Sequence, residues 1–147
     1  MIDKIICTVI FIGYLPRMQA LTGSVIGFVT FYLVPFSIIQ KLFLFIIILI
    51  SSFYSIKRYI YRSDKNDPRE IVIDEFIGAS LIAIVFSSNG LTGILTLLTF
   101  RVFDIIIIWP INVVDKLEES IGIILDDILA SIMAICVVKT SLLIYFV

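Results

Sequence analysis

Two acidic residues stand side by side in a stretch that otherwise has the composition of a membrane helix. The stretch is Ile71–Gly78, and the acids are Asp74 and Glu75. An ionised carboxylate in hydrocarbon costs roughly 2.5–3.5 kcal/mol on insertion scales, so such residues usually mark a functional site. The pair therefore predicts a site inside a membrane domain, and any proposed fold has to give these carboxylates partners.

The composition supports a membrane protein. Hydrophobic residues make up 61% of the 147 residues, whereas an ordinary globular domain has about 45–50%. A chain of this length is expected to form one domain, here a membrane-embedded domain over residues 1–147. The formal net charge of −1 leaves no basic surface for nucleic acid, which excludes nucleic-acid-binding classes.

The residue types that are missing restrict the possible chemistry. The chain has no histidine, which excludes a Ser-His-Asp triad, a phosphohistidine and histidine-based zinc sites. Its two cysteines, Cys7 and Cys136, lie in apolar runs and are interpreted as small hydrophobic side chains. Carboxylates, lysine, arginine and hydroxyls remain, and oxygen ligands of this kind suit hard cations such as Mg²⁺.

The hydrophobic pattern predicts an all-α, polytopic bundle of about five membrane helices. An N-terminal segment, Met1–Pro16, is shorter than the about 20 residues that a crossing needs, so we expect it to be interfacial or re-entrant. Loops are expected at Arg17–Ser24 and Lys57–Glu70, and a loop or interfacial helix at Ile111–Ile121. One long helix kinked at Pro35 is the alternative to the first two helices. The predicted membrane helices are Gly23–Val34, Phe36–Ile56, Ile71–Phe86, Leu91–Ile108 and Gly122–Val147.

The orientation of these helices follows from one polar segment. Lys57–Glu70 contains five of the eleven basic residues, so the positive-inside rule predicts that it faces the cytoplasm. The helices that follow then alternate in direction. This alternation brings the ionisable residues of three helices to the cytoplasmic side at similar depth: Asp74, Glu75, Arg101, Asp104, Asp126 and Asp127.

A shared cluster of carboxylates needs a counter-charge, because like charges in a low dielectric cannot all stay ionised. Arg101 supplies one positive charge, and it lies on the same helix face as Asp104, three residues later. A proton-sharing or salt-bridged structural network is one interpretation. The other is one or two bound Mg²⁺ ions, with a lipid phosphate completing the coordination.

These residues resemble the phosphatidylglycerophosphatase A family of small bacterial membrane enzymes. The resemblance runs from about Asp67 to Ala130, and the order and spacing of its blocks match the family. The blocks are Ile71–Gly78, Phe100-Arg101-x-x-Asp104, Trp109-Pro110-Ile111 with Asp115, and Gly122-Ile123-x-x-Asp126-Asp127.

The resemblance implies Mg²⁺-dependent hydrolysis of the phosphate monoester of phosphatidylglycerophosphate at the cytoplasmic face of the bacterial inner membrane. It implies Asp74, Glu75, Asp104, Asp126 and Asp127 as metal ligands. The expected catalytic residues are Asp74, Glu75, Arg101, Asp104 and Asp127, and Arg101 and Lys116 are the expected phosphate contacts. Glu75 can alternatively serve as a general base. The oligomeric state does not follow from the sequence.

Departures from the family pattern keep other functions open. Ile107 and Ile108 stand where the family has Lys-Pro, and Gln19-Ala20-Leu21 replaces an N-terminal Pro-Gly-Thr. A catalytically impaired homologue that binds lipid phosphate is therefore an alternative. A small ion transporter is another, although its acids would all lie at one face. A lipid alcohol phosphotransferase is a third, but its Asp-x-x-Asp-Gly pattern is absent.

Overall fold

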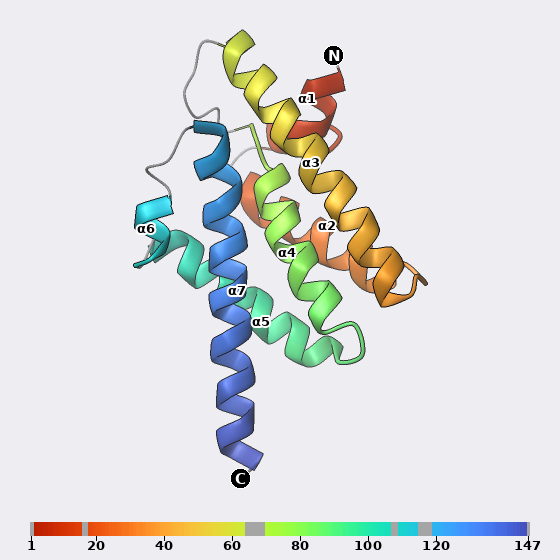
Figure 1. Cartoon of the computed structure of the whole chain (residues 1–147), viewed down its shortest axis with the longest axis vertical. Coiled ribbons are helices and arrows are strands. Elements are labelled where there is room, and N and C mark those ends of the chain that lie inside the picture. The colour runs from red at the N-terminus through yellow and green to blue at the C-terminus, as the bar shows by residue number, and fades with distance from the viewer. Residues whose placement is uncertain (1, 16–17, 64–69, 107–108, 115–118, 147) are drawn as a thin grey trace.

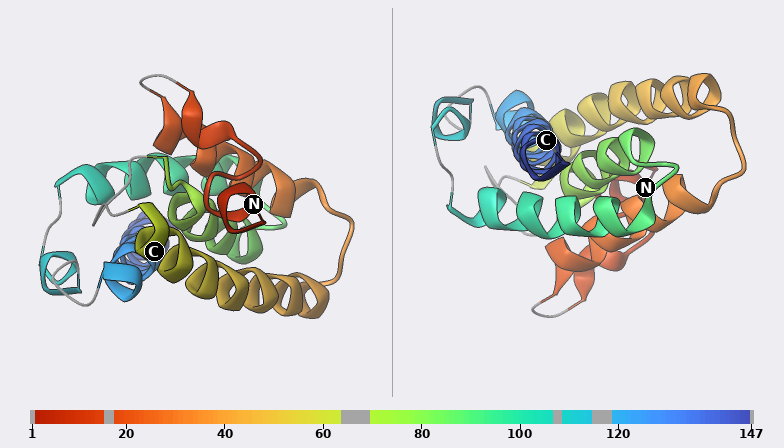
Figure 2. Two further views of the ribbon diagram at one scale, coloured as in Figure 1. Left: turned by 90° about the horizontal axis from the view of Figure 1, so that it is seen from above. Right: turned by 90° about the horizontal axis from the view of Figure 1, so that it is seen from below.

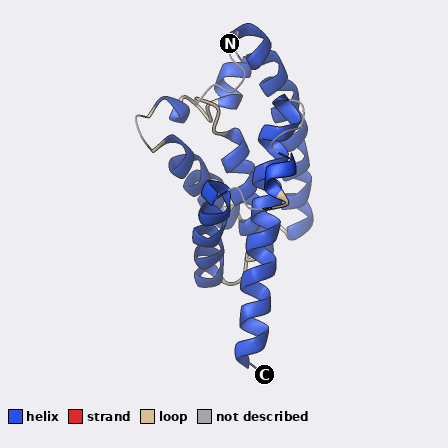
Figure 3. Ribbon diagram, turned by 90° about the vertical axis from the view of Figure 1, so that its left-hand side faces the viewer, coloured by secondary structure: helices blue, strands red, loops and turns tan. Residues whose placement is uncertain are grey.

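The computed structural model describes residues 2–15, 18–63, 70–106, 109–114 and 119–146, and within these ranges all regular structure is helical (Figure 3). This confirms the all-α prediction. The elements are α1 (Ile2–Cys7), a 3-10 helix η1 (Ile12–Tyr14), α2 (Gln19–Leu33), α3 (Ile38–Ser63), α4 (Ile73–Val85), α5 (Gly90–Ile106), α6 (Ile111–Val114) and α7 (Glu119–Phe146).

Helix α4 is the centre of the bundle. It contacts α2, α3, α5 and α7, and Figure 2 shows it between α3 and α5. Nine of its 13 residues are buried. Its first turn lies at the end of the bundle where α3 finishes and α7 begins (Figure 1). The start of α4 is therefore the point that neighbouring helices can reach with their side chains.

Two glycines of α2 allow this helix to touch the backbone of α4. A Cβ atom added to Gly27 would lie 2.3 Å from the carbonyl oxygen of Phe76, and one added to Gly23 would lie 2.9 Å from that of Val72. The Gly23–Gly27 spacing is the small-xxx-small pattern that permits close helix approach in membranes. Backbone contact replaces side-chain packing between these helices.

The N-terminal segment folds onto the same end of the bundle. Asp3 of α1 forms an ion pair with Arg62 of α3 at 2.7 Å, and the amide of Val72 donates to the carbonyl of Cys7. Between α1 and η1, Val9, Ile10 and Phe11 all have positive φ angles, a conformation that side chains rarely adopt. The Thr8 hydroxyl accepts a hydrogen bond from the Phe11 amide and stabilises this turn.

Two predicted boundaries are wrong, and the predicted division into two helices near Pro35 is confirmed. Helix α2 begins at Gln19, inside the segment expected to be a loop, because the Ser24 hydroxyl bonds to the Ala20 carbonyl within the helix instead of starting one. Helix α3 continues beyond Ile56 to Ser63, because Ile56 and Ile60 pack into the core through the segment expected to be a polar loop.

Within the described ranges, two helices are long and apolar enough to cross a membrane, namely α3 and residues Ser120–Tyr145 of α7. By contrast α2, α4 and α5 have 15, 13 and 17 residues, and a straight crossing needs about 20. The structure therefore supports membrane association through two helices, and the count of five crossings stays a prediction.

We predict that Gly27→Ala destabilises the fold by about 1–3 kcal/mol, the usual effect of overpacking. Alanine is the better helix former by about 1 kcal/mol, so in the absence of the contact with Phe76 the substitution would stabilise. Val29→Ala is the matched control, because Val29 lies on the same helix and is 43% exposed. Thermal unfolding in detergent micelles, followed by circular dichroism, measures both. A Gly27→Ala protein that melts at or above the parent's temperature contradicts the prediction.

Candidate functional site

Three carboxylates from two helices converge at the start of α4. Oxygen atoms of Asp74, Glu75 and Asp127 all lie within 4.8 Å of one another. Asp127 is only 3% exposed, and the other two residues are partly buried. One oxygen of each carboxylate is buried and has no hydrogen-bond partner among the described residues: Asp74 Oδ1, Glu75 Oε2 and Asp127 Oδ1. We call these three residues the acidic cluster.

The geometry of the helices explains why the cluster forms. Asp74 and Glu75 lie in the first turn of α4, where unpaired N–H groups and the helix dipole favour negative charge. Gly78 lies one turn further along, and a Cβ atom there would lie 3.0 Å from both the Asp127 carbonyl oxygen and the Phe100 ring. Helices α4, α5 and α7 therefore meet beside the cluster because residue 78 has no side chain.

A positive charge lies next to the acidic cluster. Arg101 Nη1 donates to Asp104 Oδ2 at 2.7 Å and to Ser24 Oγ at 3.3 Å. Asp104 is close enough to interact electrostatically with each member of the cluster, and Arg101 is close enough to interact with Glu75. The guanidinium is thus held by α2 and α5 at the edge of the cluster, and about 15% of its side chain remains exposed.

The other predicted site residues occupy different positions. Asp126 is not part of the three-carboxylate group; its Oδ1 accepts a hydrogen bond from the Asp127 amide at 2.8 Å. Asp104 is paired with Arg101 and also lies outside the group. The predicted phosphate contact Lys116 and the site-wall candidate Asp115 lie outside the described residues, as do Ile107 and Ile108.

Ser24 is a site residue that the sequence did not single out as functional. It is fully buried on α2, its hydroxyl donates to the Ala20 carbonyl, and it accepts from Arg101. The available signal was its place directly after Gly23 in a small-residue stretch. Such a stretch indicates close contact between helices, but it does not show which side chain of a neighbouring helix Ser24 binds.

Cys7 can be assigned a packing role. The residue is fully buried where α1 ends, and burial, helped by the nearby charge of Asp3, raises the pKa of its thiol to about 12. A nucleophilic cysteine needs a lowered pKa, because the thiolate is the reactive form. The sequence interpretation of Cys7 as a small hydrophobic residue agrees with this environment.

The acidic cluster fits a divalent cation. Three buried, unpaired carboxylate oxygens repel one another, and a hard cation between them would neutralise the charge and occupy every open acceptor. Oxygens on opposite sides of a Mg²⁺ ion lie about 4.2 Å apart, twice the usual Mg–O distance. The carboxylate oxygens of the cluster lie within 4.8 Å of one another, which is close to that spacing. An all-oxygen donor set favours Mg²⁺, Mn²⁺ or Ca²⁺ over softer metals.

Comparisons with known proteins agree with this site. The family model described as phosphatidylglycerophosphatase A matches residues 5–142. The chain is also similar to the phosphatidylglycerophosphatase A of Haemophilus influenzae, with 41% identity over 75 residues. That alignment covers 50% of this chain and 46% of the relative, so it spans about half of each protein. No solved structure matches the chain.

The family match includes both helices that contribute the acidic cluster and the α5 segment that contributes Arg101. It also includes Ser24 on α2 and the glycines that bring α2, α4 and α7 together. Because the match extends over most of the 147 residues, the chain belongs to the phosphatidylglycerophosphatase A family.

Proposed function

We propose that this protein hydrolyses the phosphate monoester of phosphatidylglycerophosphate, giving phosphatidylglycerol and inorganic phosphate, with Mg²⁺ as the cofactor. The observation that carries the proposal is the acidic cluster, whose three buried oxygens have no hydrogen-bond partner. Arg101 beside the cluster supplies the anion-binding group that a phosphate needs. Family membership and the name of the relative indicate the lipid substrate.

The proposed setting is the bacterial inner membrane, with the site facing the cytoplasm. The basic end of α3, the start of α4 and the start of α7 lie at the same end of the bundle (Figure 1), and the positive-inside rule assigns this end to the cytoplasm. In this arrangement α2, α3, α4, α5 and α7 are the five membrane helices. Of the three short helices, α4 is covered by its neighbours, with nine of its 13 residues buried, whereas α2 and α5 bury five residues each.

The carboxylates have distinct proposed roles. Asp74, Glu75 and Asp127 would hold Mg²⁺, which when bound neutralises phosphoryl oxygens and activates water for attack. As an alternative to the ligand role, Glu75 is the candidate general base for the attacking water. Asp126 would fix the backbone of Asp127 through the hydrogen bond to its amide.

Arg101 is proposed to bind the phosphate that is transferred. Its planar guanidinium can form two parallel hydrogen bonds to phosphoryl oxygens, while Asp104 and Ser24 hold the side chain in place. Water attacks phosphorus, the bond from phosphorus to the glycerol oxygen breaks, and the released alcohol oxygen takes up a proton. Inorganic phosphate then leaves into the aqueous phase. Lys116 remains a second candidate for phosphate contact.

We predict that Asp127→Asn abolishes Mg²⁺ binding while the protein still folds. Saturating a site at 100 times its Kd stabilises a protein by about 2.7 kcal/mol. At roughly 2–4 °C per kcal/mol, MgCl₂ should raise the melting temperature of the EDTA-treated parent by about 5–10 °C. Asp127→Asn should show no such shift. Its rate of phosphate release should fall at least about 100-fold, which exceeds the usual effect of losing a residue that only hydrogen-bonds to a metal ligand.

Asp126→Asn is the matched control, because asparagine keeps the acceptor for the Asp127 amide. This variant should retain most of the Mg²⁺-dependent shift. An unchanged shift in Asp127→Asn, or its complete loss in Asp126→Asn, contradicts the ligand assignment.

We predict that Arg101→Gln lowers kcat for a short-chain substrate by about 10²–10³-fold, the usual effect of removing a donor that acts on developing charge. Ser24→Ala removes one contact of the guanidinium and leaves Asp104 in place, so about a tenfold decrease is expected. Phosphate release in mixed micelles gives kcat and KM for each variant. If Arg101→Gln raises KM but leaves kcat unchanged, Arg101 binds substrate and transition state equally and the proposed role is wrong.

A further inference from the structure

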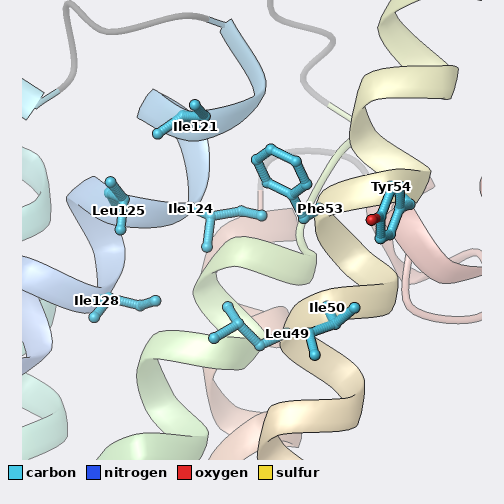
Figure 4. Close-up of a pocket in the computed structure, with 8 residues that line it drawn as sticks. All are labelled: Leu49, Ile50, Phe53, Tyr54, Ile121, Ile124, Leu125 and Ile128. Atoms are coloured by element: carbon cyan, nitrogen blue, oxygen red, sulfur yellow. The ribbon is translucent and has the colours of Figure 1, made fainter.

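An apolar groove runs between α3 and α7 on the side of the bundle. Its volume is about 410 Å³, within the about 300–1,000 Å³ typical of ligand sites. Figure 4 shows Leu49 and Phe53 of α3 pointing toward Ile124 and Ile128 of α7 across it. The lining residues are Leu49, Ile50, Phe53, Tyr54, Ile121, Ile124, Leu125 and Ile128.

The groove adjoins the acidic cluster. Ile124 and Ile128, two of its lining residues, stand three positions before and one position after Asp127 on α7. Asp127 turns into the bundle and is 3% exposed, whereas Leu125 on the groove is 39% exposed. The same turns of α7 therefore present carboxylate to the cluster and hydrocarbon to the groove.

A basic pocket continues the groove toward the C-terminal end of α3. Tyr54 lines both the groove and this second pocket, which has a volume of about 590 Å³. Tyr61 and three cationic residues, Lys57, Arg58 and Arg62, complete it. Arg62 is paired with Asp3, and within the described part of the chain no ion pair involves Lys57 or Arg58. The two pockets together are apolar at one end and cationic at the other.

We infer that the groove holds one acyl chain of the lipid phosphate substrate, and that Lys57 and Arg58 hold the phosphodiester of the same molecule. This inference rests on the proposed function. A glycerophospholipid is apolar at one end and anionic at the other, which matches the order of the two pockets along α3. From Ile121 to Ile128 the groove extends about 10 Å along α7, so it covers the upper part of one chain.

The site would favour substrates that carry an acyl chain over the headgroup alone. Ile50→Trp places an indole in the groove at a position that is 54% exposed, so the substitution need not disturb the core. Ile46→Trp is the matched control, one turn earlier on α3, 50% exposed and outside the groove. The substrates are dioleoyl phosphatidylglycerophosphate in mixed micelles and its deacylated headgroup, glycerophosphoglycerophosphate, in the same buffer, with melting temperature as the check on folding.

We predict that Ile50→Trp raises KM for the dioleoyl substrate about tenfold and leaves KM for the deacylated headgroup unchanged, because the headgroup has no chain to place in the groove. Ile46→Trp should change neither value. A ratio of kcat/KM between the dioleoyl substrate and the deacylated headgroup that equals the parent's overturns the inference. An Ile50→Trp protein that keeps this ratio but has a different oligomeric state, measured by light scattering, also overturns the inference. The groove would then be an interface between copies of the chain.

The basic pocket has its own test. The double variant Lys57→Gln/Arg58→Gln should raise KM about fivefold for both substrates, because both carry the phosphodiester. An unchanged KM overturns this part of the inference.

Failure of the proposed function gives a different result, since the parent protein would then hydrolyse neither substrate. In that case native mass spectrometry with added dioleoyl phosphatidylglycerol tests the groove alone. Retention of the lipid by Ile46→Trp and its loss by Ile50→Trp would support the groove. Equal retention would overturn it.

Discussion

The structure depends on how closely other helices approach the backbone of α4. Glycines at positions 23 and 27 place α2 against the carbonyls of Val72 and Phe76, and Gly78 places α7 and α5 against the other side. Larger residues at these positions would separate the helices by the thickness of a side chain. Because α4 carries two members of the acidic cluster and α7 the third, the same contacts determine whether the carboxylates can share one cation.

The charges in this site are arranged in two layers. The inner layer consists of three carboxylates with unpaired buried oxygens, which favours a divalent cation. The outer layer is Arg101, held by Asp104 and Ser24, with part of the guanidinium exposed. A phosphate between the layers would meet positive charge on both sides. This arrangement explains how a negatively charged substrate can approach a cluster of negatively charged side chains.

The helical fold, the family and the helices that bear the site could be predicted from the sequence, because acids in apolar stretches are rare and their spacing is characteristic. The sequence did not separate the cluster from its neighbours. Asp126 and Asp127 are adjacent and look equivalent, yet helix rotation turns one toward Asp74 and leaves the other bonded to a backbone amide. Ser24 and the α3–α7 groove were missed because each depends on a contact between helices distant in the chain.

The groove between α3 and α7 opens toward the flank of the bundle, where Ile50 and Tyr54 are more than half exposed. A lipid seated there would keep its hydrocarbon tails in the bilayer throughout turnover and would exchange by lateral diffusion in two dimensions. Orthophosphate, the other product, would depart into water. The two products would thus separate into different phases as soon as they form, and recombination would require them to meet again across the boundary.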